Sequence, residues 1–443
     1  MNNNKPTILI IFGISGDLAR RYLLPAIGAI ASAKMIPEQF HIMGLTRQSG
    51  ITKDFLLKKT PNKEFLSDHL SLEQVDVTNI DDYKKLGKQL KDLSEKFGTP
   101  CQYIFYLSVP PQVSRSIIEF LGVSELSQIG ETKLLLEKPF GVDLENATDL
   151  ARHTDKYFSS TQVYRVDHYM AKETAQNIIV FRGGNSLFKK TWNKDFIERI
   201  EIVASEEIDI EGRANFYEQV GALRDYVQSH LLQLLALTLM ELPEDDKLSE
   251  VPHLRLEALK HLSISNVSEN ALRGQYKGYT DEVNNPNSKI ETFVSITLES
   301  SDERWRGVPI TLTTGKALKE KSTLIRILYK KDKDNESNEL LLRLQPEEGI
   351  QFNMWAKHPG YERKVSPHNL SFKFREHYDV LPEAYEQVLF NAINSDHSLF
   401  TTSDEILEAW RILDGLQKTW EKSSEGLVIY KKGSTISEIL SNE

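Results

Sequence analysis

The stretch Arg165–Glu173, which reads RVDHYMAKE, places an acid, a histidine, a tyrosine and a lysine within six residues, as Asp167, His168, Tyr169 and Lys172. Polar groups with complementary charge gather in this way mainly where an anion or a transferable proton is held. A surface turn of solvated charges has the same composition. The stretch is a candidate for chemistry, and the elements around it must decide between the two interpretations.

A second candidate is His230, in the helical stretch Phe216–Leu242, which is apolar on nearly all sides from Leu231 onward. A lone histidine there is more often a core residue with a satisfied hydrogen bond. As a base it would need a carboxylate to fix its tautomer. Asp225 would lie about 140° around an α-helix from His230. Asp167 is therefore the expected partner.

A glycine turn near the N-terminus indicates a cofactor. The run Thr7–Phe12 is almost entirely β-branched or aromatic, as in a strand buried on both faces, and Gly13-Ile-Ser-Gly16-Asp-Leu-Ala19 precedes a helical segment. This strand, turn and helix match a G-x-x-G-x-x-A variant of the dinucleotide fingerprint, whose small residues let the backbone approach a pyrophosphate. The pattern favours a dinucleotide site over a simple turn.

The end of the next expected strand, His41–Leu45, favours one cofactor. Thr46-Arg47-Gln48 follows it, and no Asp or Glu lies between Phe40 and Lys53. An acid at this place binds the ribose of NAD, whereas an arginine can pair with a 2′-phosphate. We expect NADP, with NAD as a secondary cofactor, although a solvated loop arginine would look the same.

Strands and helices alternate from residue 7 to 166, which is typical of an α/β domain. The strands Gln102–Leu107 and Lys133–Leu136 run into Ser108-Val-Pro-Pro111 and Glu137-Lys-Pro-Phe-Gly141, at strand ends where such sheets bind ligands. Beyond Lys172, strands with hairpin-like spacing accompany two helical regions. We predict a Rossmann-like doubly wound sheet (residues 1–167), then an α+β domain with a large, mainly antiparallel sheet (residues 168–443).

The bulk composition restricts the function. The 443 residues imply two or three domains, and 54 basic against 64 acidic residues give a net charge of −10. This charge argues against a nucleic-acid partner. The single Cys101 excludes an intramolecular disulfide, and neither a signal peptide nor a membrane span is found. We expect a cytoplasmic protein with no membrane partner, and we identify no metal site.

Ten segments, in family order over nearly the whole chain, resemble the glucose-6-phosphate dehydrogenase family. They are GISGDLA (13–19), GLTRQ (44–48), FYLSVPP (105–111), EKPFG (137–141), RVDHYMAKE (165–173), EGR (211–213), GALRDYVQSHLLQLL (221–235), WRGVP (305–309), TGKALKEK (314–321) and EAWRILD (408–414).

The resemblance implies a role for each candidate residue. His230 would take the proton of the sugar's anomeric hydroxyl, while hydride leaves C1 for the nicotinamide, and Asp167 would support the imidazolium. The remaining roles are phosphate binding by His168, Tyr169 and Lys172; hydroxyl binding by Glu206 and Asp225; contacts with substrate or cofactor by Lys138, Lys316 and Lys321; and an NADP site lined by Gly13, Ser15, Gly16, Asp17, Leu18, Arg47, Gln48, Pro110 and Lys138. A cis bond before Pro139 would aim Lys138 into the site.

Two departures from the family pattern stand out. The basic run after the glycine turn usually has a lysine in third place, where this chain has Tyr22, and Ala171 replaces a glycine. A site that lacks one cation could prefer an amino sugar phosphate such as glucosamine 6-phosphate. A dehydrogenase of unphosphorylated sugars and a non-catalytic, cofactor-binding paralogue are further alternatives. An uncovered face of the second sheet would favour a homodimer or a higher homo-oligomer.

Overall fold

The computed structural model describes residues 4–244, 247–331, 337–422 and 426–441. It divides into two compact units, of which the first comprises Met1–Ala171, Lys247–Pro252 and Pro382–Asp404. The second comprises Lys172–Asp246, His253–Leu381 and Glu405–Glu443. Among the helices of these ranges, we find none that combines the length and the apolar composition required to cross a membrane.

This division amends the boundary predicted after residue 167. The first unit extends to Ala171, and a late segment, Pro382–Asp404, returns to it. The physical reason is the helix α14 (Ala384–Ile393), whose buried Val388, Leu389 and Ala392 belong to the same apolar core as strand residues Leu9 and Ile11. Burying these side chains stabilises the first unit by completing one of its helix layers.

The first unit contains a six-stranded sheet in the order β3-β2-β1-β4-β5-β6. All its neighbouring strands are parallel, and the order is that of a dinucleotide-binding Rossmann fold. The strands are β1 (Thr7–Phe12), β2 (Phe40–Thr46), β3 (Leu70–Gln74), β4 (Gln102–Leu107), β5 (Glu131–Leu136) and β6 (Val163–Arg165). The predicted bounds of β1 and β4 are confirmed residue for residue.

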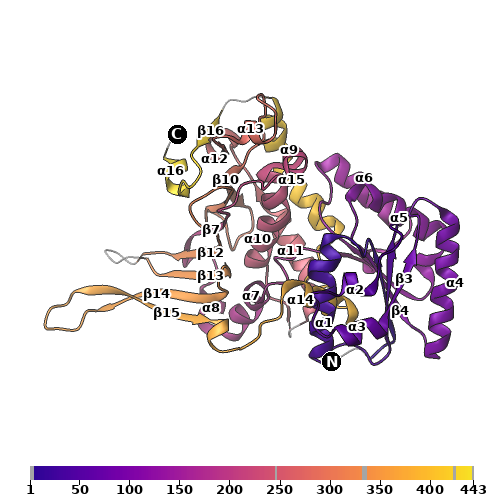
Figure 1. Ribbon diagram of the computed structural model, residues 1–443. Helices are drawn as coiled ribbons and strands as arrows, with labels where there is room; N and C mark the ends of the chain where they lie inside the picture. The colour runs from indigo at the N-terminus through magenta and orange to yellow at the C-terminus, as the bar shows by residue number, and fades with distance from the viewer. Residues whose placement is uncertain (1–3, 245–246, 332–336, 423–425, 442–443) are drawn as a thin grey trace. The chain divides into compact units, whose positions relative to one another are not determined.

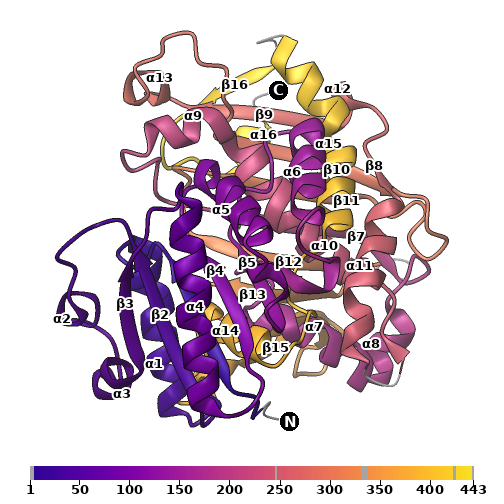
Figure 2. The ribbon, with the colours of Figure 1, turned by 90° about the vertical axis from the view of Figure 1, so that its right-hand side faces the viewer.

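Helices cover both faces of this sheet, as Figures 1 and 2 show. One apolar core lies under α1 and α14, and a second lies under α4 and α5. The helical elements are η1 (Ala19–Leu23, a π-turn), α1 (Leu24–Ser32), α2 (Lys53–Leu56), α3 (Lys63–His69), α4 (Ile80–Phe97), α5 (Pro111–Val123), η2 (Leu126–Gln128), α6 (Leu144–Asp155), η3 (Ser160–Gln162) and η6 (Leu248–Glu250).

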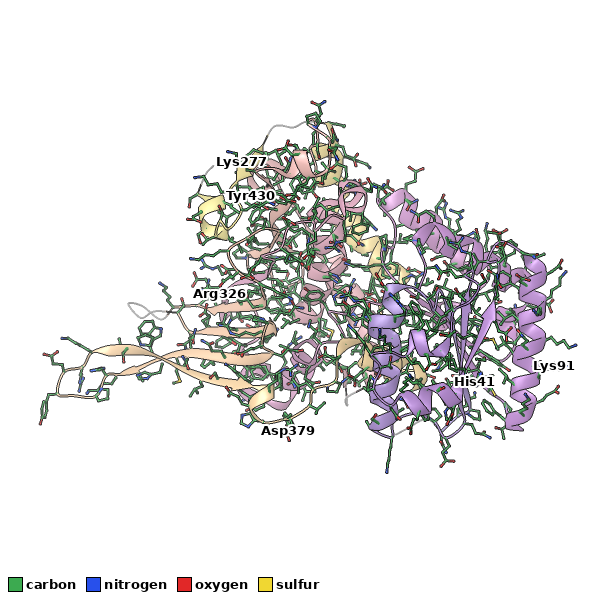
Figure 3. The ribbon with its side chains drawn as sticks, viewed as in Figure 1. His41, Lys91, Lys277, Arg326, Asp379 and Tyr430 are labelled. Carbon is green, nitrogen blue, oxygen red and sulfur yellow. The ribbon has the colours of Figure 1, made fainter. Side chains whose placement is uncertain are left out.

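The second unit is built on a large sheet in the order β15-β14-β13-β12-β7-β11-β10-β9-β16, with β8 paired to β10. Its pairs are antiparallel except β7 with β11 and β9 with β16. The strands are β7 (Ile197–Ser205), β8 (Leu262–Ser263), β9 (Ala271–Tyr276), β10 (Phe293–Ser300), β11 (Ile310–Gly315), β12 (Ser322–Tyr329), β13 (Glu339–Gln345), β14 (Gly349–Lys357), β15 (Val365–Lys373) and β16 (Leu427–Tyr430). The predicted α+β class with a mainly antiparallel sheet is thus confirmed. In Figure 3, Arg326 marks β12 and Tyr430 marks β16.

The helices of this unit include those that carry candidate site residues. They are α7 (Glu173–Gly184), α8 (Ser186–Thr191), α9 (Ala214–Ala222), η4 (Leu223–Leu231), α10 (Leu232–Leu239), α11 (Val251–Lys260), α12 (Val267–Asn270), α13 (Tyr279–Glu282), η7 (Phe374–Glu376), α15 (Ser403–Lys422) and α16 (Ile436–Leu440). The helical stretch predicted over Phe216–Leu242 is confirmed as helical up to Leu239, but it is not one continuous α-helix. Gly221, with φ 64° and ψ 177°, interrupts it, and η4 is a π-helix.

Candidate active site

The glycine turn forms one wall of a hollow at the carboxyl ends of β1, β2 and β4. Gly13 has φ +79°, and a Cβ atom there would lie 2.3 Å from the carbonyl oxygen of Ser108. Only glycine therefore allows the first turn after β1 to pass so close to the chain that follows β4. The backbone N–H of Gly16 donates to the Gly13 carbonyl at 2.9 Å and closes the turn.

The hollow has a volume of about 180 Å³ and collects most of the predicted cofactor residues. It is lined by Gly13, Ser15, Gly16, Leu45, Thr46, Arg47, Gln48, Val75, Val77, Ser108, Val109, Pro110 and Val113. Asp17, Leu18 and Lys138 are not among the lining residues. Asp17 instead pairs with Arg20 at 2.9 Å, and Leu18 packs against the apolar core.

Two hydroxyl groups in this hollow were missed by the sequence reasoning. The Thr46 hydroxyl lies 3.1 Å from the Ser15 hydroxyl and accepts from the Gln48 N–H at 3.1 Å, which fixes the turn after β2. The Ser108 hydroxyl oxygen is buried and has no hydrogen-bond partner. A buried polar atom without a partner is costly, so it fits a cofactor group that would complete its hydrogen bonding. Their positions, directly after strands, were the signal that could have found them.

The charges around this hollow suit an anionic ligand. Arg47 is the one cation among its lining residues, and they include no carboxylate. Asp76 lies near its edge, where hydrogen bonds from Thr78 and, to a smaller extent, the charge of Arg47 lower the pKa of its carboxyl. Arg47 is exposed and can turn toward a ligand phosphate.

After β6 the RVDHY stretch forms a tight turn. Asp167 is 4% exposed, and its Oδ1 accepts the backbone N–H of Tyr169 at 2.9 Å. The rings of His168 and Tyr169 lie 4.9 Å apart. The first unit therefore brings together an acid, an imidazole and a phenol, and Lys172 follows as the N-cap residue of α7 in the second unit.

A half-buried carboxyl group, that of Glu137, directly precedes Lys138 in the sequence at the end of β5. Glu137 accepts from the Tyr106 hydroxyl at 2.5 Å and also from the hydroxyl of Tyr385 on α14. Burial raises the pKa of Glu137 to about 7, against the opposing effect of these hydrogen bonds and of Lys138. The Lys138–Pro139 peptide bond is cis.

Tyr22 lies beside Tyr385, one of the two donors to this carboxyl group. Its ring is 46% exposed and lies 5.5 Å from the ring of Tyr385. Arg20 pairs with Asp17 at 2.9 Å and packs over the ring of Phe55 at 4.8 Å.

The second unit presents His230 and Asp225 on the π-helix η4. His230 is 1% exposed. In a π-helix the backbone bonds join residues five apart, so Asp225 and His230 lie one turn apart on the same side. The predicted separation of about 140° between Asp225 and His230, which holds for an α-helix, is therefore wrong.

Glu291 fixes where this helix begins. Its carboxylate accepts the N–H of Leu223 at 2.9 Å, and its backbone carbonyl accepts the N–H of Ala222 at 2.9 Å. A Cβ atom at Gly221 would lie 2.5 Å from the Glu291 Oε1. Glycine at this break therefore leaves room for the carboxylate that caps the helix.

Glu206 and Lys316 form an ion pair at 2.5 Å, and Lys316 is 3% exposed. Lys316 also lies over the ring of Tyr217 at 5.4 Å. Lys321, by contrast, is exposed directly before β12. In this unit the structure thus joins Glu206 with Lys316, but it gives Lys321 no contact with them.

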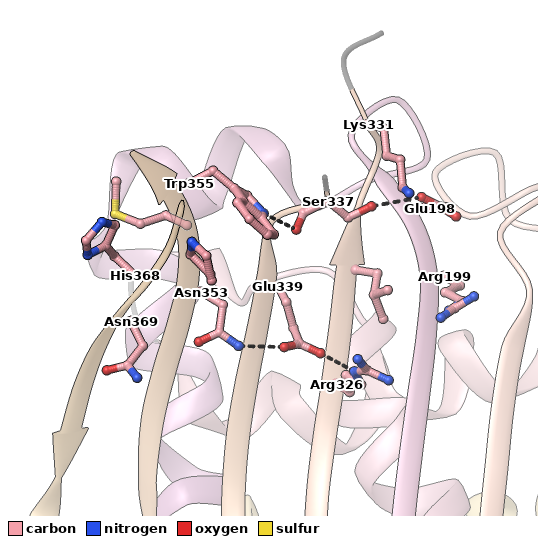
Figure 4. Close-up of a pocket in the computed structure, with 13 residues that line it drawn as sticks. Glu198, Arg199, Arg326, Lys331, Ser337, Glu339, Asn353, Trp355, His368 and Asn369 are labelled. Atoms are coloured by element: carbon pink, nitrogen blue, oxygen red, sulfur yellow. Dashed lines mark hydrogen bonds and ion pairs between the residues drawn. The ribbon is translucent and has the colours of Figure 1, made fainter. Parts of the chain in front are cut away.

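A larger cavity, of about 580 Å³, lies on the large sheet of the second unit (Figure 4). Its lining differs from the groups of candidate site residues described above. Three of its charged side chains, Arg199, Arg326 and Glu339, form ion pairs. Arg326 contacts Glu201 at 3.1 Å and also Glu339, which accepts from the Asn353 amide at 2.6 Å. None of the predicted site residues lines it.

Comparisons with known proteins agree with this architecture. Residues 10–177 match the family model "Glucose-6-phosphate dehydrogenase, NAD binding domain", and residues 179–441 match "Glucose-6-phosphate dehydrogenase, C-terminal domain". A solved structure described as glucose-6-phosphate dehydrogenase in complex with its substrate glucose-6-phosphate superposes with a TM-score of 0.93, at 29% identity, over 100% of this chain and 98% of that one.

Two curated relatives are named glucose-6-phosphate 1-dehydrogenase. The protein of Chlamydia muridarum is 34% identical, over 94% of this chain and 91% of the relative. That of Bacillus subtilis strain 168 is 33% identical, over 98% of this chain and 95% of the relative.

The fold and the hollow define a nicotinamide-dinucleotide oxidoreductase with a Rossmann-like unit and a mainly antiparallel α+β unit. The chain belongs to the glucose-6-phosphate dehydrogenase family.

Proposed function

We propose that this chain oxidises glucose 6-phosphate at C1 to 6-phosphogluconolactone, with hydride transfer to NADP. The observation that carries the proposal is the buried His230 on a π-helix that also presents Asp225, in a member of this family. Such a site suits the removal of a hydroxyl proton while hydride leaves the same carbon.

In the proposed reaction, His230 accepts the proton of the C1 hydroxyl as the C1–O bond becomes a carbonyl. Bound NADP supplies the acceptor for the two electrons that leave C1 as hydride. Asp167 fixes the tautomer of His230 and stabilises the imidazolium formed. A positioned base of this kind contributes about 10² to 10⁴ to the rate.

Other residues orient the sugar. His168, Tyr169 and Lys172 bind the phosphate, a dianion that suits several donors. Asp225 and Glu206 accept hydrogen bonds from sugar hydroxyls, and Lys138, Lys316 and Lys321 contact substrate or cofactor oxygens. Distant phosphate binding supplies orientation that lowers the barrier at C1.

The cofactor occupies the hollow after β1. Its glycine turn, with Ser15, Gln48 and Pro110, receives the pyrophosphate and ribose, and the arginine after β2 pairs with a 2′-phosphate. Support comes from the partnerless Ser108 hydroxyl and the carboxylate-free lining. NAD lacks the 2′-phosphate and serves as a weaker substitute.

We place the enzyme in the cytoplasm as a homodimer or higher homo-oligomer. Support for self-association comes from β15, where Val365, Leu370 and Phe372 are 60%, 63% and 36% exposed. Large exposed apolar side chains on an edge strand favour pairing with another copy.

Tyr22 favours one alternative substrate. Because the third residue of the basic run carries no charge, a phosphosugar with its own ammonium group, such as glucosamine 6-phosphate, is the second candidate. Turnover on glucose 6-phosphate that greatly exceeds turnover on the amino sugar would exclude it.

The direct test is the rise in absorbance of reduced nicotinamide when the purified protein meets glucose 6-phosphate and NADP. His230→Asn should lower kcat by at least about 10³-fold, and unphosphorylated glucose should react poorly. His253→Asn, at an exposed histidine of α11, is the matched control and should retain full activity. Absence of reduction by the wild-type protein with any phosphosugar would support a non-catalytic paralogue.

A further inference from the structure

The ammonium group of Lys316 is held between a carboxylate and an aromatic ring. Lys316 is 3% exposed, and its Nζ donates to the Glu206 Oε2 at 2.5 Å. The same nitrogen lies 5.4 Å from the centroid of the Tyr217 ring. A lysine ammonium has three N–H donors, and in the described ranges we find no hydrogen bond from this one other than that to Glu206. The ammonium therefore keeps donors that can bind oxygen atoms of a ligand.

The backbone of Lys316 is fixed by its surroundings. Its N–H donates to the Thr292 carbonyl at 2.9 Å, and its carbonyl accepts from the Tyr430 hydroxyl of β16 at 2.7 Å. The next residue, Ala317, has φ +52°, a left-handed conformation that is costly for a residue with a Cβ atom and persists only where contacts enforce it. One such contact is the Gly433 N–H, which donates to the Ala317 carbonyl at 2.7 Å. What remains to be positioned at Lys316 is its four-carbon side chain.

The ring of Tyr217, on α9, is itself held in place. Tyr217 is 2% exposed, and its ring lies edge-on to that of Tyr279, with 6.2 Å between the ring centroids. Tyr279 in turn donates its hydroxyl to the Glu218 Oε2 at 2.8 Å. The Tyr217 hydroxyl is buried and has no hydrogen-bond partner in the described part of the chain. The ring is thus the part of Tyr217 that acts on Lys316, since a cation within about 6 Å of an aromatic face is attracted to it.

We propose that Tyr217 is a positioning residue whose ring, together with the Glu206 carboxylate, holds the Lys316 ammonium in place before the sugar phosphate binds. The kinetic consequence rests on the proposed function, which the inference deepens. Because Lys316 pairs with Glu206, a proposed sugar contact, we assign it to the sugar and not to the cofactor. A flexible lysine side chain loses rotamer entropy when a ligand immobilises it. Here that loss occurs on folding, so substrate binding does not have to overcome it.

A kinetic comparison of three variants tests the positioning role. Tyr217→Leu removes the ring face and should raise KM for glucose 6-phosphate about tenfold, with KM for NADP and kcat unchanged. Tyr217→Met, which fills more of the vacated volume, should show the same rise if the leucine variant folds poorly. Tyr217→Phe keeps the ring face and should stay within about twofold of the wild-type KM. Tyr329→Leu, at a tyrosine of β12 whose ring packs against Phe352, is the matched control and should retain full activity.

Two outcomes of this comparison would overturn the proposal. Equal losses in Tyr217→Phe and Tyr217→Leu would show that the hydroxyl, and not the ring, is responsible. A loss that appears in KM for NADP would assign the ring to the cofactor side.

A double variant tests whether Tyr217 acts through Lys316. In a Lys316→Met background, Tyr217→Leu should change KM for glucose 6-phosphate by less than about twofold, because the ammonium that the ring positions is gone. A further tenfold rise in that background would mean that Tyr217 acts on the substrate by another route, and the positioning role would be refuted.

Thermal unfolding of the same four proteins tests the contact without activity. The decreases in Tm caused by Tyr217→Leu and Lys316→Met should sum to more than the decrease in the double variant, since each single change already removes the attraction between ring and ammonium. If the wild-type protein reduces no NADP, the proposed function fails, and the Tm comparison still decides whether the ring holds the ammonium. If the enzyme is active and the Tm decreases are additive, only the inference about Tyr217 fails.

Discussion

The cofactor hollow of the first unit and the π-helix of the second unit illustrate two ways to build a site. The hollow is made of backbone, glycines and small hydroxyl residues, and it contains a single cation, Arg47. The π-helix and the residues that flank β10 and β11 carry buried charged or titratable side chains, namely His230, Glu291 and Lys316. The first should therefore be sensitive to added volume, and the second to lost charge or displaced geometry.

Gly13→Ala should have the largest effect, because the new Cβ atom would meet the Ser108 carbonyl at 2.3 Å. We expect KM for NADP to rise about 100-fold, since the turn must move away from the pyrophosphate. Gly50→Ala is the control, because Gly50 has the same φ of +79° but open space around it. Equal losses in the two variants would show that backbone strain, and not space, matters at the turn.

Gly221→Ala tests the second unit in the same way. The added Cβ would displace the Glu291 carboxylate, and with it the start of η4, so kcat should fall about 50-fold while the Kd for NADP stays unchanged. Gly307→Ala, at φ +85° with nothing close by, is the matched control. A change confined to KM for NADP would contradict the expectation that this helix affects the catalytic step and not cofactor binding.

Lys316→Met leaves Glu206 without its ion-pair partner. We expect the free energy of unfolding to fall by about 2 kcal/mol, because the carboxylate is left without its counter-charge. Chemical denaturation measures this. The double variant with Glu206→Gln should recover most of the loss, and a loss of equal size in the double variant would mean that packing, not charge, is responsible.

Arg47→Ala should have the smallest effect. We expect kcat/KM for NADP to fall about tenfold and that for NAD to remain unchanged, since only NADP has the 2′-phosphate. Steady-state kinetics with both cofactors measure the ratio. Equal losses with both would assign Arg47 to the ribose or adenine instead.

The parallel sheet could be predicted well from sequence because its strands are buried on both faces. β1 and β4 read as unbroken apolar runs bounded by turn residues, and their bounds were correct. The glycine turn was recognised for the same reason, since a close approach of backbones admits only small residues. The buried strands and the glycine turn together explain why most of the predicted cofactor residues line the hollow.

The strands β14 and β15 were not predicted, because their patterns are weak. β15 contains Pro367 and is largely exposed, so neither alternation nor hydrophobicity distinguishes it from a loop. The π-helix was also missed. Its apolar spacing resembles that of an α-helix, and only the positive φ of Gly221 and the cap that Glu291 gives to Leu223, 68 residues away in sequence, separate the two. The contact between Tyr22 and Tyr385 likewise joins residues that no local pattern connects.

The return of residues 382–404 to the first unit also has a consequence for the order of synthesis. Lys133 is 2% exposed, and its ammonium donates to the Ala392 carbonyl at 2.7 Å and to the Ser395 hydroxyl at 2.7 Å. A ribosome that has made only the first 171 residues has synthesised every strand of the parallel sheet, but not these acceptors or the apolar face of α14. One face of the nascent sheet therefore stays exposed until most of the second unit has been translated. A gene fragment that ends after Ala171 should accordingly yield an aggregation-prone product, and fusing residues 382–404 to it should restore solubility.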